Sequence, residues 1–173
     1  MERDMIRSYA KIYHKLSEAK SYSSFRGWTD DDPNYVGLQG ECAVVKYLGR
    51  DIFAYLEGRP KWKGDEGFDI TIDGKTYDVK TRVSKDAGLN LRCFIPAATL
   101  EKDVYGYIFV TKCGDAFYPC GFISKEDFVR KAVFGRKGEM LRTGYFKTDT
   151  YHLHPSELSP MEALEGLGLH YFM

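Results

Sequence analysis

Residues 67–80 constrain the fold of this chain more than any other stretch, because they predict a β-hairpin with a defined register. Asp73 and Gly74 stand between two runs that are rich in Ile, Thr, Tyr and Val. An Asp-Gly pair in that setting favours a two-residue type I′ turn, which needs a positive φ at both central positions. We therefore expect Ile72 and Lys75 to close the turn.

The register of this hairpin brings acidic side chains together. Counted back from the turn, Asp69 lies opposite Asp78, and Lys80 follows two residues later on the same face. Directly opposed residues have Cβ atoms roughly 4.5–5.5 Å apart, so two ionised carboxylates there repel each other. The pair needs a counter-charge, for which a divalent metal ion is the simplest candidate. The alternative is an exposed charge ladder on a solvated sheet face.

A helix is predicted over residues 35–48, ended by Gly49, and it carries one acid in an unusual position. On a helical wheel, Glu41 falls in the middle of an apolar stripe made by Gly37, Val44, Val45 and Leu48. Glutamate is rarely buried without a partner, because removing an unpaired carboxylate from water is costly. The partner is either a salt-bridging residue or a metal ion or site lysine met across the core. We also expect Gly37 and Gly40 to let the helix approach another backbone closely.

The rest of the chain is predicted to mix strands and helices. The expected elements are a helix over 3–20, strands over 51–56, 89–95, 104–112, 116–123 and 151–153, short helices over 96–101 and 124–130, and a weak helix over 156–167. The strand over 89–95 should join the sheet of the hairpin, and 151–153 should form an edge. The strand over 104–112 is nearly continuously apolar, which is typical of a strand buried on both faces.

Together these features resemble the active-site pattern of the PD-(D/E)xK nuclease superfamily. That family places an acid on its first helix, a second acid in a β-hairpin and an acid-x-lysine motif on the partner strand. Glu41, Asp69, Asp78 and Lys80 match these positions. Phe68 stands where the family pattern has proline, and the acid-x-lysine motif carries Asp, which the pattern permits.

The resemblance implies an α+β or α/β fold in which helices flank a central mixed β-sheet. Its αβββαβ core, the restriction-endonuclease-like fold, would span about residues 35–125. An extra N-terminal helix and a loop would occupy residues 1–34, and residues 126–173 would hold a basic segment and C-terminal elements. At this length, residues 1–173 are expected to form a single nuclease-like domain.

The resemblance also implies a reaction, the hydrolysis of DNA phosphodiester bonds with Mg²⁺, for which Mn²⁺ would substitute. Asp69 and Asp78 would hold the metal ion through hard oxygen ligands, with the Val79 carbonyl as an additional ligand. Lys80 would orient or deprotonate the attacking water, and Glu41 would anchor the site. Endonuclease and exonuclease activity both stay open. The alternative is a nucleic-acid-binding protein that keeps the fold without catalysis.

Two basic segments are candidates for contacts with the DNA backbone, the loop over 57–66 and the stretch over 130–147, where Glu139 is the single acid. Basic side chains next to aromatic ones suit such contacts. The candidate residues are Lys61, Lys63, Arg82, Arg136, Lys137, Arg142 and Lys147. For both segments, a solvated loop is the alternative interpretation.

Composition limits the remaining choices. Lys plus Arg and Asp plus Glu number 25 each, so DNA binding has to come from local clusters rather than from net charge. None of the four cysteines forms a Cys-x-x-Cys pair, which indicates reduced thiols rather than a metal knuckle. No apolar run approaches the roughly 18 residues of a membrane span, and the charged N-terminus is unlike a secretion signal. We expect a soluble cytoplasmic protein whose partner is DNA, with homodimer formation left open.

Overall fold

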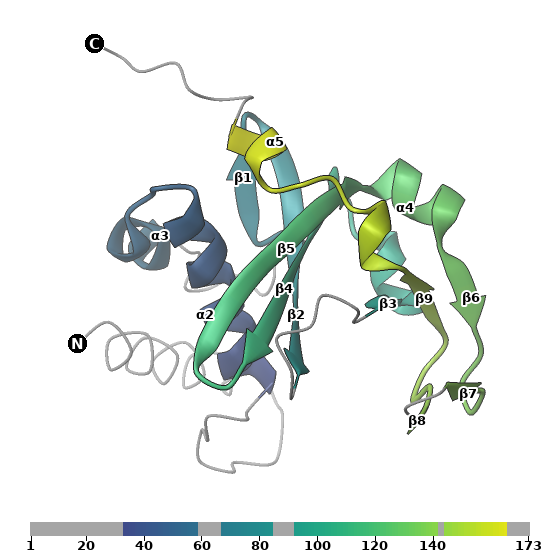
Figure 1. Ribbon diagram of the computed structural model, residues 1–173. Helices are drawn as coiled ribbons and strands as arrows, with labels where there is room; N and C mark the ends of the chain where they lie inside the picture. The colour runs from purple at the N-terminus through teal and green to yellow at the C-terminus, as the bar shows by residue number, and fades with distance from the viewer. Residues whose placement is uncertain (1–32, 59–66, 85–91, 142–143, 166–173) are drawn as a thin grey trace, which may run out of the picture.

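The computed structural model describes residues 33–58, 67–84, 92–141 and 144–165, and it has a mixed α+β architecture (Figure 1). The helices are α2 (Pro33–Tyr47), α3 (Ile52–Gly58), α4 (Lys125–Lys131) and α5 (Glu162–Glu165), with 3₁₀ turns η1 (Ala97–Glu101) and η2 (Pro155–Glu157). The strands are β1 (Ile70–Ile72), β2 (Lys75–Ser84), β3 (Cys93–Pro96), β4 (Gly106–Cys113), β5 (Ala116–Ser124), β6 (Val133–Gly135), β7 (Met140–Leu141), β8 (Gly144–Tyr145) and β9 (Thr150–Leu153).

The hairpin forms with the predicted register. β1 pairs antiparallel with β2 so that Ile70 lies opposite Tyr77, and the turn residues Asp73 and Gly74 have φ angles of 50° and 74°. β2 runs parallel to β4, and β4 runs antiparallel to β5, which gives a four-stranded mixed sheet of order β1-β2-β4-β5. Every residue of β4 before Cys113 is buried, as expected for a central strand.

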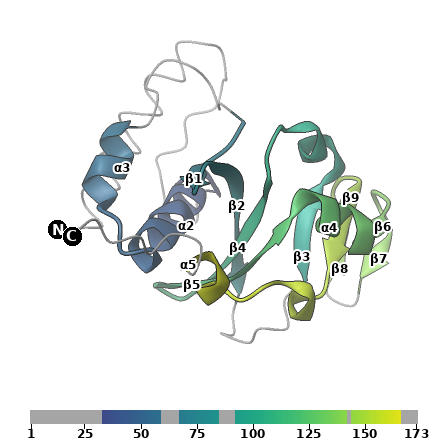
Figure 2. The ribbon, with the colours of Figure 1, turned by 90° about the horizontal axis from the view of Figure 1, so that it is seen from above.

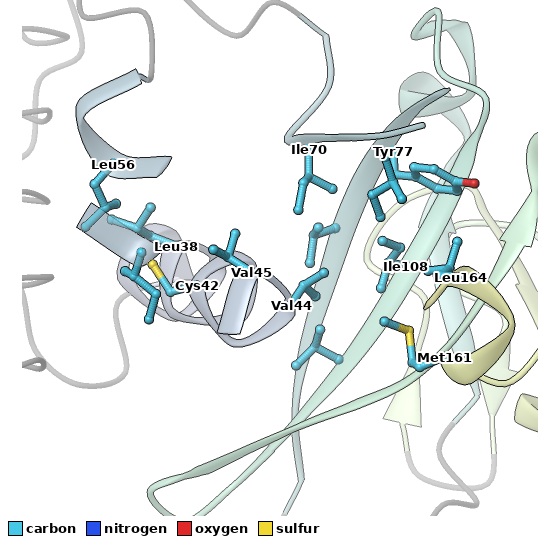
Figure 3. Packing of buried hydrophobic residues seen from close by; sticks show 14 of the residues in the cluster. Leu38, Cys42, Val44, Val45, Leu56, Ile70, Tyr77, Ile108, Met161 and Leu164 are labelled. Atoms are coloured by element: carbon cyan, nitrogen blue, oxygen red, sulfur yellow. The ribbon is translucent and has the colours of Figure 1, made fainter. Parts of the chain in front are cut away.

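The larger core fills the space between α2 and one face of this sheet. Figure 3 shows Val44 and Val45 of α2 pointing at the sheet, and both are buried in one cluster with Ile108 of β4. Met161, just before α5, and Leu164, within α5, are buried in the same cluster. Burying one such side chain stabilises the fold by roughly 1.5–3 kcal/mol relative to leaving it exposed.

One glycine lets α2 approach the sheet closely, as predicted. A Cβ built at Gly40 would lie 1.8 Å from Thr81 Oγ1 of β2, so no side chain fits there. The same expectation for Gly37 is wrong, because a Cβ at that position meets nothing within 4 Å. The contact at Gly40 brings the next residue of α2, Glu41, against the strand that carries the acid-x-lysine motif.

The strand predicted over residues 51–56 is wrong, because this stretch forms α3. The side chain of Asp51 accepts a hydrogen bond from the backbone N–H of Phe53 at 2.7 Å, and so caps the helix N-terminus. Ile52 and Leu56, four residues apart, turn together into the core. A short apolar run such as Ile52 to Leu56 is compatible with a strand, but the cap and the spacing of the two buried residues are helical signals.

Two further strand predictions need correction. The strand predicted over residues 89–95 is described from residue 92 onward. There β3 does not join the main sheet but pairs with β9 in a second sheet of order β3-β9-β6. β9 is therefore the central strand of that sheet and not an edge. The physical reason is the parallel pairing of β2 with β4, which needs a long crossover connection, and β3 and η1 form part of it.

The second sheet and α4 cover the face of the main sheet opposite α2 (Figure 2). A smaller core forms there, in which Tyr107 and Phe109 of β4 pack on Phe128 of α4. Ser124 caps α4 as predicted, since its Oγ accepts a hydrogen bond from the Asp127 N–H at 3.1 Å. The short helix expected over 96–101 is the 3₁₀ turn η1, preceded by Pro96.

The helix predicted over residues 156–167 is interrupted in its described part. η2 and α5 are separate, and between them Ser159 exchanges backbone hydrogen bonds with Phe122 of β5. Pro160 follows directly, and its ring prevents the preceding residue from continuing a helix. The helix predicted over 3–20 lies outside the described residues. Within those residues, no helix is long and apolar enough to cross a membrane.

Candidate active site

Asp69 lies at the point where β1 begins, and its carboxylate is fixed by the backbone of β2. Its N–H continues the hairpin by donating to the Tyr77 carbonyl at 2.9 Å. Its Oδ2 accepts a hydrogen bond from the Val79 N–H at 2.7 Å. The register predicted that the side chains of Asp69 and Asp78 face each other. Instead, the Asp69 side chain turns toward the edge of β2 and binds the backbone of Val79.

Asp78 is 1% exposed and lies between two ammonium groups. Lys102 Nζ donates to its Oδ1 at 3.3 Å, and Lys80 Nζ forms an ion pair with its Oδ2. The Lys80 contact lacks hydrogen-bond geometry, so Oδ2 is a buried acceptor without a hydrogen bond. The predicted pairing of Asp78 with Lys80 on one face is present. Lys102 was not predicted, because it lies 24 residues further along the chain.

Glu41 is buried, as the helical wheel predicted, with 8% of its surface exposed. The hydroxyl of Tyr55 in α3 donates to Glu41 Oε2 at 2.6 Å and lies 3.1 Å from the Asp69 carbonyl oxygen. The Tyr55 side chain therefore connects α3 to the carboxylate of Glu41 and to the backbone of Asp69. Sequence reasoning missed Tyr55 because it assigned residues 51–56 to a strand. The Asp51 cap and the apolar spacing that follows it were the signals that would have placed Tyr55 on a helix.

The electrostatics of Asp69 link the four residues of the motif. Burial is the main cause that raises the pKa of Asp69 to about 8, and the neighbouring charges of Glu41 and Asp78 add to it. The hydrogen bond from Val79 and the charge of Lys80 lower that pKa in part. Asp69 is thus affected electrostatically by Glu41, Asp78 and Lys80, the other members of the predicted set.

The donor set at this site fits a hard divalent cation held by two carboxylates. Within the described residues, no three Asp, Glu, His or Cys side chains are grouped to hold a metal ion by themselves. Mg²⁺ needs fewer protein ligands, because it usually keeps several waters and binds one or two carboxylates plus substrate phosphates. Asp78 Oδ2 is a buried oxygen that is ion-paired with Lys80 but accepts no hydrogen bond, and the charge of Asp78 contributes to a raised pKa of Asp69 that a cation would lower. The Val79 carbonyl points to the same strand edge as its N–H, toward Asp69.

Four of the predicted DNA-contact residues lie within the described part of the chain, and two of them, Arg82 and Lys147, line one cavity. Lys61, Lys63 and Arg142 lie outside the described residues. Arg136, Lys137 and Lys147 are exposed. Two acids bind the backbone of this segment: Glu139 accepts from the N–H of Arg136 at 2.9 Å, and Asp149 accepts from the N–H of Lys137 at 2.8 Å. These two hydrogen bonds fix the backbone of the segment, while the side chains of Arg136 and Lys137 stay exposed.

Arg82 has a different environment from the exposed basic residues. Its guanidinium donates to the Arg92 carbonyl at 2.8 Å and lies 4.6 Å from the centre of the Phe94 ring. Burial lowers its pKa from the ordinary value for arginine. Arg82 is therefore held in a fixed position two residues after Lys80, on the same face of β2.

Comparisons with known proteins identify no family for this chain. It is 30% identical over 98 residues to an uncharacterized protein of Archaeoglobus fulgidus, and the match covers 48% of this chain and 16% of that protein. The chain therefore spans about a sixth of the length of that relative. No known family profile matches the sequence. No solved structure matches it either.

Proposed function

We propose that this protein is a metal-dependent nuclease that hydrolyses DNA phosphodiester bonds. The observation that carries the proposal is the buried carboxylate of Asp78, which is paired with Lys80 and whose charge, together with that of Glu41, raises the pKa of Asp69. Burying several ionisable groups together is costly, and clusters with a strongly shifted pKa are common at functional sites.

Each side chain has a definite task in this proposal. Asp69 and Asp78 would hold Mg²⁺ or Mn²⁺, with the Val79 carbonyl as a further oxygen ligand. When bound, the cation offsets the charge of the scissile phosphate and lowers the pKa of nearby water. Lys80 would orient the attacking water and offset the negative charge that develops on the phosphate.

Glu41, Tyr55 and Lys102 would act through the other residues. Glu41 raises the pKa of Asp69 and so disfavours its ionised form until a cation is present. Tyr55 fixes Glu41 through a hydrogen bond of 2.6 Å. Lys102 holds Asp78 Oδ1 and leaves Oδ2 directed at Lys80. These three are positioning residues, since no contact with the phosphate is needed for their effects.

The fold supports the proposal in part. A helix with a buried acid, a hairpin that carries two acids, and a later strand parallel to the acid-x-lysine strand follow the restriction-endonuclease-like order. The departures are α3, which replaces an expected strand, and β3, which joins the second sheet. Both departures leave the motif-bearing elements adjacent, because α2 still packs on β2 at Gly40.

Cleavage of supercoiled plasmid DNA tests the proposal. The native protein should nick the plasmid with Mg²⁺ or Mn²⁺ and lose this activity with a chelator. Lys80→Ala should lower the rate by about 10²–10⁴-fold, the usual contribution of a positioned acid–base group, with little change in DNA affinity. Lys46→Ala, at an exposed position of α2, is the matched control and should cleave normally.

Two outcomes would count against this function. Undiminished turnover by Lys80→Ala would remove this lysine from the mechanism. The absence of cleavage of supercoiled, linear, single-stranded and branched DNA with either metal would favour the second candidate, a DNA-binding protein without catalysis. One observation favours that candidate: in the structure Asp78 is already flanked by two ammonium groups.

A further inference from the structure

A cavity of about 640 Å³ lies between the two sheets, next to the candidate active site. One wall comes from the face of β2 that carries Lys80 and Arg82, and the opposite wall comes from β3 and from residues 145–150 before and within β9. Figure 2 shows β3 and β9 on this side of the main sheet, opposite α2. Lys80 therefore belongs both to the cavity wall and to the ion pair with Asp78.

The charge of the cavity wall is of one sign. Among the described residues that line it, the ionised side chains are Lys80, Arg82, Arg92 and Lys147, and none is a carboxylate. The whole chain has equal numbers of acidic and basic residues, so this concentration is local. Low-dielectric walls that carry a single sign of charge raise the local concentration of ions of the opposite sign. The cavity is therefore suited to an anion.

The same wall offers surfaces on which a planar ring can stack. Phe94 is half-buried, and the Arg82 guanidinium lies 4.6 Å from its ring centre, held by a hydrogen bond to the Arg92 carbonyl. Tyr145, 65% exposed, lines the cavity from β8. Unstacked nucleobases pack on aromatic rings and on arginine guanidinium planes. Anion-binding groups next to stacking surfaces match the two parts of a nucleotide.

We infer that this cavity receives one unpaired nucleotide of the DNA substrate, beside the bond to be cleaved, an assignment that rests on the proposed nuclease function. Its volume is within the range of roughly 300–1,000 Å³ that is common for sites of drug-sized ligands, which a single nucleotide matches. Residues two apart on a strand are separated by about 6.6 Å, so Arg82, Lys80 and Asp78 form a row from the cavity to the carboxylates. A nucleotide in the cavity would place its phosphate at Lys80.

A site for one unpaired nucleotide favours a particular class of DNA substrate. A base inside a paired stack cannot reach the stacking surfaces of the cavity wall, whereas a mismatched, bulged or single-stranded base leaves the stack at lower cost. The preferred substrates are therefore duplexes with an unpaired position, flaps or frayed ends rather than fully paired DNA. A free mononucleotide shares this chemistry, so the experiment includes it as a separate probe.

Binding without cleavage tests the inference on the full chain. Two fluorescent duplexes of one sequence, fully paired or with one unpaired nucleotide, are titrated in Ca²⁺ and followed by anisotropy. We expect the native protein to bind the duplex with the unpaired nucleotide at least about tenfold more tightly, a ratio that a few stacking and phosphate contacts supply. Thr148→Trp places a bulky ring at an exposed position of the cavity wall and should bring the ratio close to one.

Two further variants show whether a changed affinity ratio comes from the cavity or from loss of folded protein. Val129→Trp adds the same ring to an exposed position of α4 away from the cavity, and it should keep the native ratio. Arg92→Ala removes an exposed cation from the wall and should lower the ratio at least about threefold with a native circular dichroism spectrum. Retention of the native ratio by both Thr148→Trp and Arg92→Ala would overturn the inference.

The remaining outcomes separate the inference from the proposed function. Equal affinity of the native protein for the two duplexes overturns the inference, and Mg²⁺-dependent cleavage of the paired duplex would leave the function standing. A preference for the unpaired nucleotide without cleavage in Mg²⁺ would support the cavity assignment and contradict the nuclease. Binding of deoxythymidine monophosphate as tight as that of the duplex with an unpaired nucleotide would assign the cavity to free nucleotides and overturn the inference.

Discussion

The Asp69 carboxylate accepts a hydrogen bond from the backbone N–H of Val79 at 2.7 Å, at the edge of β2 where β1 has not yet begun. This contact holds an acid that is otherwise disfavoured in its ionised form. Burial, Glu41 and Asp78 together raise the pKa of Asp69 to about 8, from an ordinary value of 3.8. The consequence is a pH dependence of both stability and metal binding.

The free energy of unfolding of the metal-free protein should fall as the pH rises from about 4 to about 8. In that window the folded protein holds a proton on Asp69 that the unfolded chain has released, so stability decreases with pH. Asp69→Asn cannot ionise and should show a flatter profile. Urea unfolding of both proteins in a chelator at pH 5 and pH 8 measures the difference, and parallel profiles would contradict the assignment.

Removal of the Tyr55 hydroxyl should destabilise the protein. Tyr55→Phe removes the hydrogen bond of 2.6 Å that the hydroxyl donates to buried Glu41, at a cost of roughly 1–3 kcal/mol. Tyr118→Phe, at a position that is 47% exposed, is the control and should change the free energy by less than about 0.5 kcal/mol. Chemical denaturation measures both, and equal small effects would show that Tyr55 does not support the acid.

The close approach of α2 to β2 leads to a pair of opposite predictions for two glycines of one helix. Gly40→Ala should destabilise the fold, because its Cβ would lie 1.8 Å from Thr81 Oγ1. Gly37→Ala meets nothing and should stabilise the helix by roughly 0.5–1 kcal/mol. Adding Thr81→Ala to Gly40→Ala should recover part of the loss. Thermal unfolding of the four proteins tests this, and a neutral Gly40→Ala would contradict the packing.

The exposed basic residues of the segment 130–147 should contact the DNA backbone without reading the sequence. Replacing Arg136 and Lys137 by Ala should weaken binding to all DNA sequences. It should also flatten the slope of log K against log[salt] by up to about two units, since each phosphate contact contributes roughly 0.9. Cleavage at saturating DNA should persist.

A control for this double variant removes the same charge elsewhere, at exposed Lys46 and Arg50 near the C-terminal end of α2. This control should keep the native salt slope. If the Arg136 and Lys137 variant also keeps the native affinity and slope, the segment is a solvated surface loop. The contacts with the DNA backbone would then come from other residues.

Local signals predicted the hairpin and its register, although the Asp69 side chain turns to the backbone of Val79 instead of facing Asp78. The Asp73-Gly74 turn determines the register through its own backbone conformation, so Ile70 and Tyr77 could be paired from the sequence. The burial of Glu41 was likewise visible, because helical periodicity is a property of neighbouring residues. These elements depend on interactions within a few residues along the chain.

Contacts between distant parts of the chain were not predictable in the same way. Lys102 reaches Asp78 only because η1 lies in the crossover between two parallel strands, and β3 pairs with β9 more than fifty residues later. Tyr55 was assigned to a strand because its segment is a short apolar run, although the cap at Asp51 is a local signal for a helix. Tertiary packing decided the positions of Lys102 and β3, whereas the helix that holds Tyr55 had a local signal.

Binding of Mn²⁺ at Asp69 and Asp78 is the most direct test of the candidate metal site, and thermal unfolding with and without Mn²⁺ measures it. At a hundredfold excess over Kd, a ligand of the folded state adds about 2.7 kcal/mol, which is a rise in Tm of roughly 5–10 °C for a domain of this size. The native protein and the exposed control Glu57→Ala should both show this rise, and Asp69→Ala should show much less. Equal shifts in all three proteins would place the metal elsewhere and contradict the account.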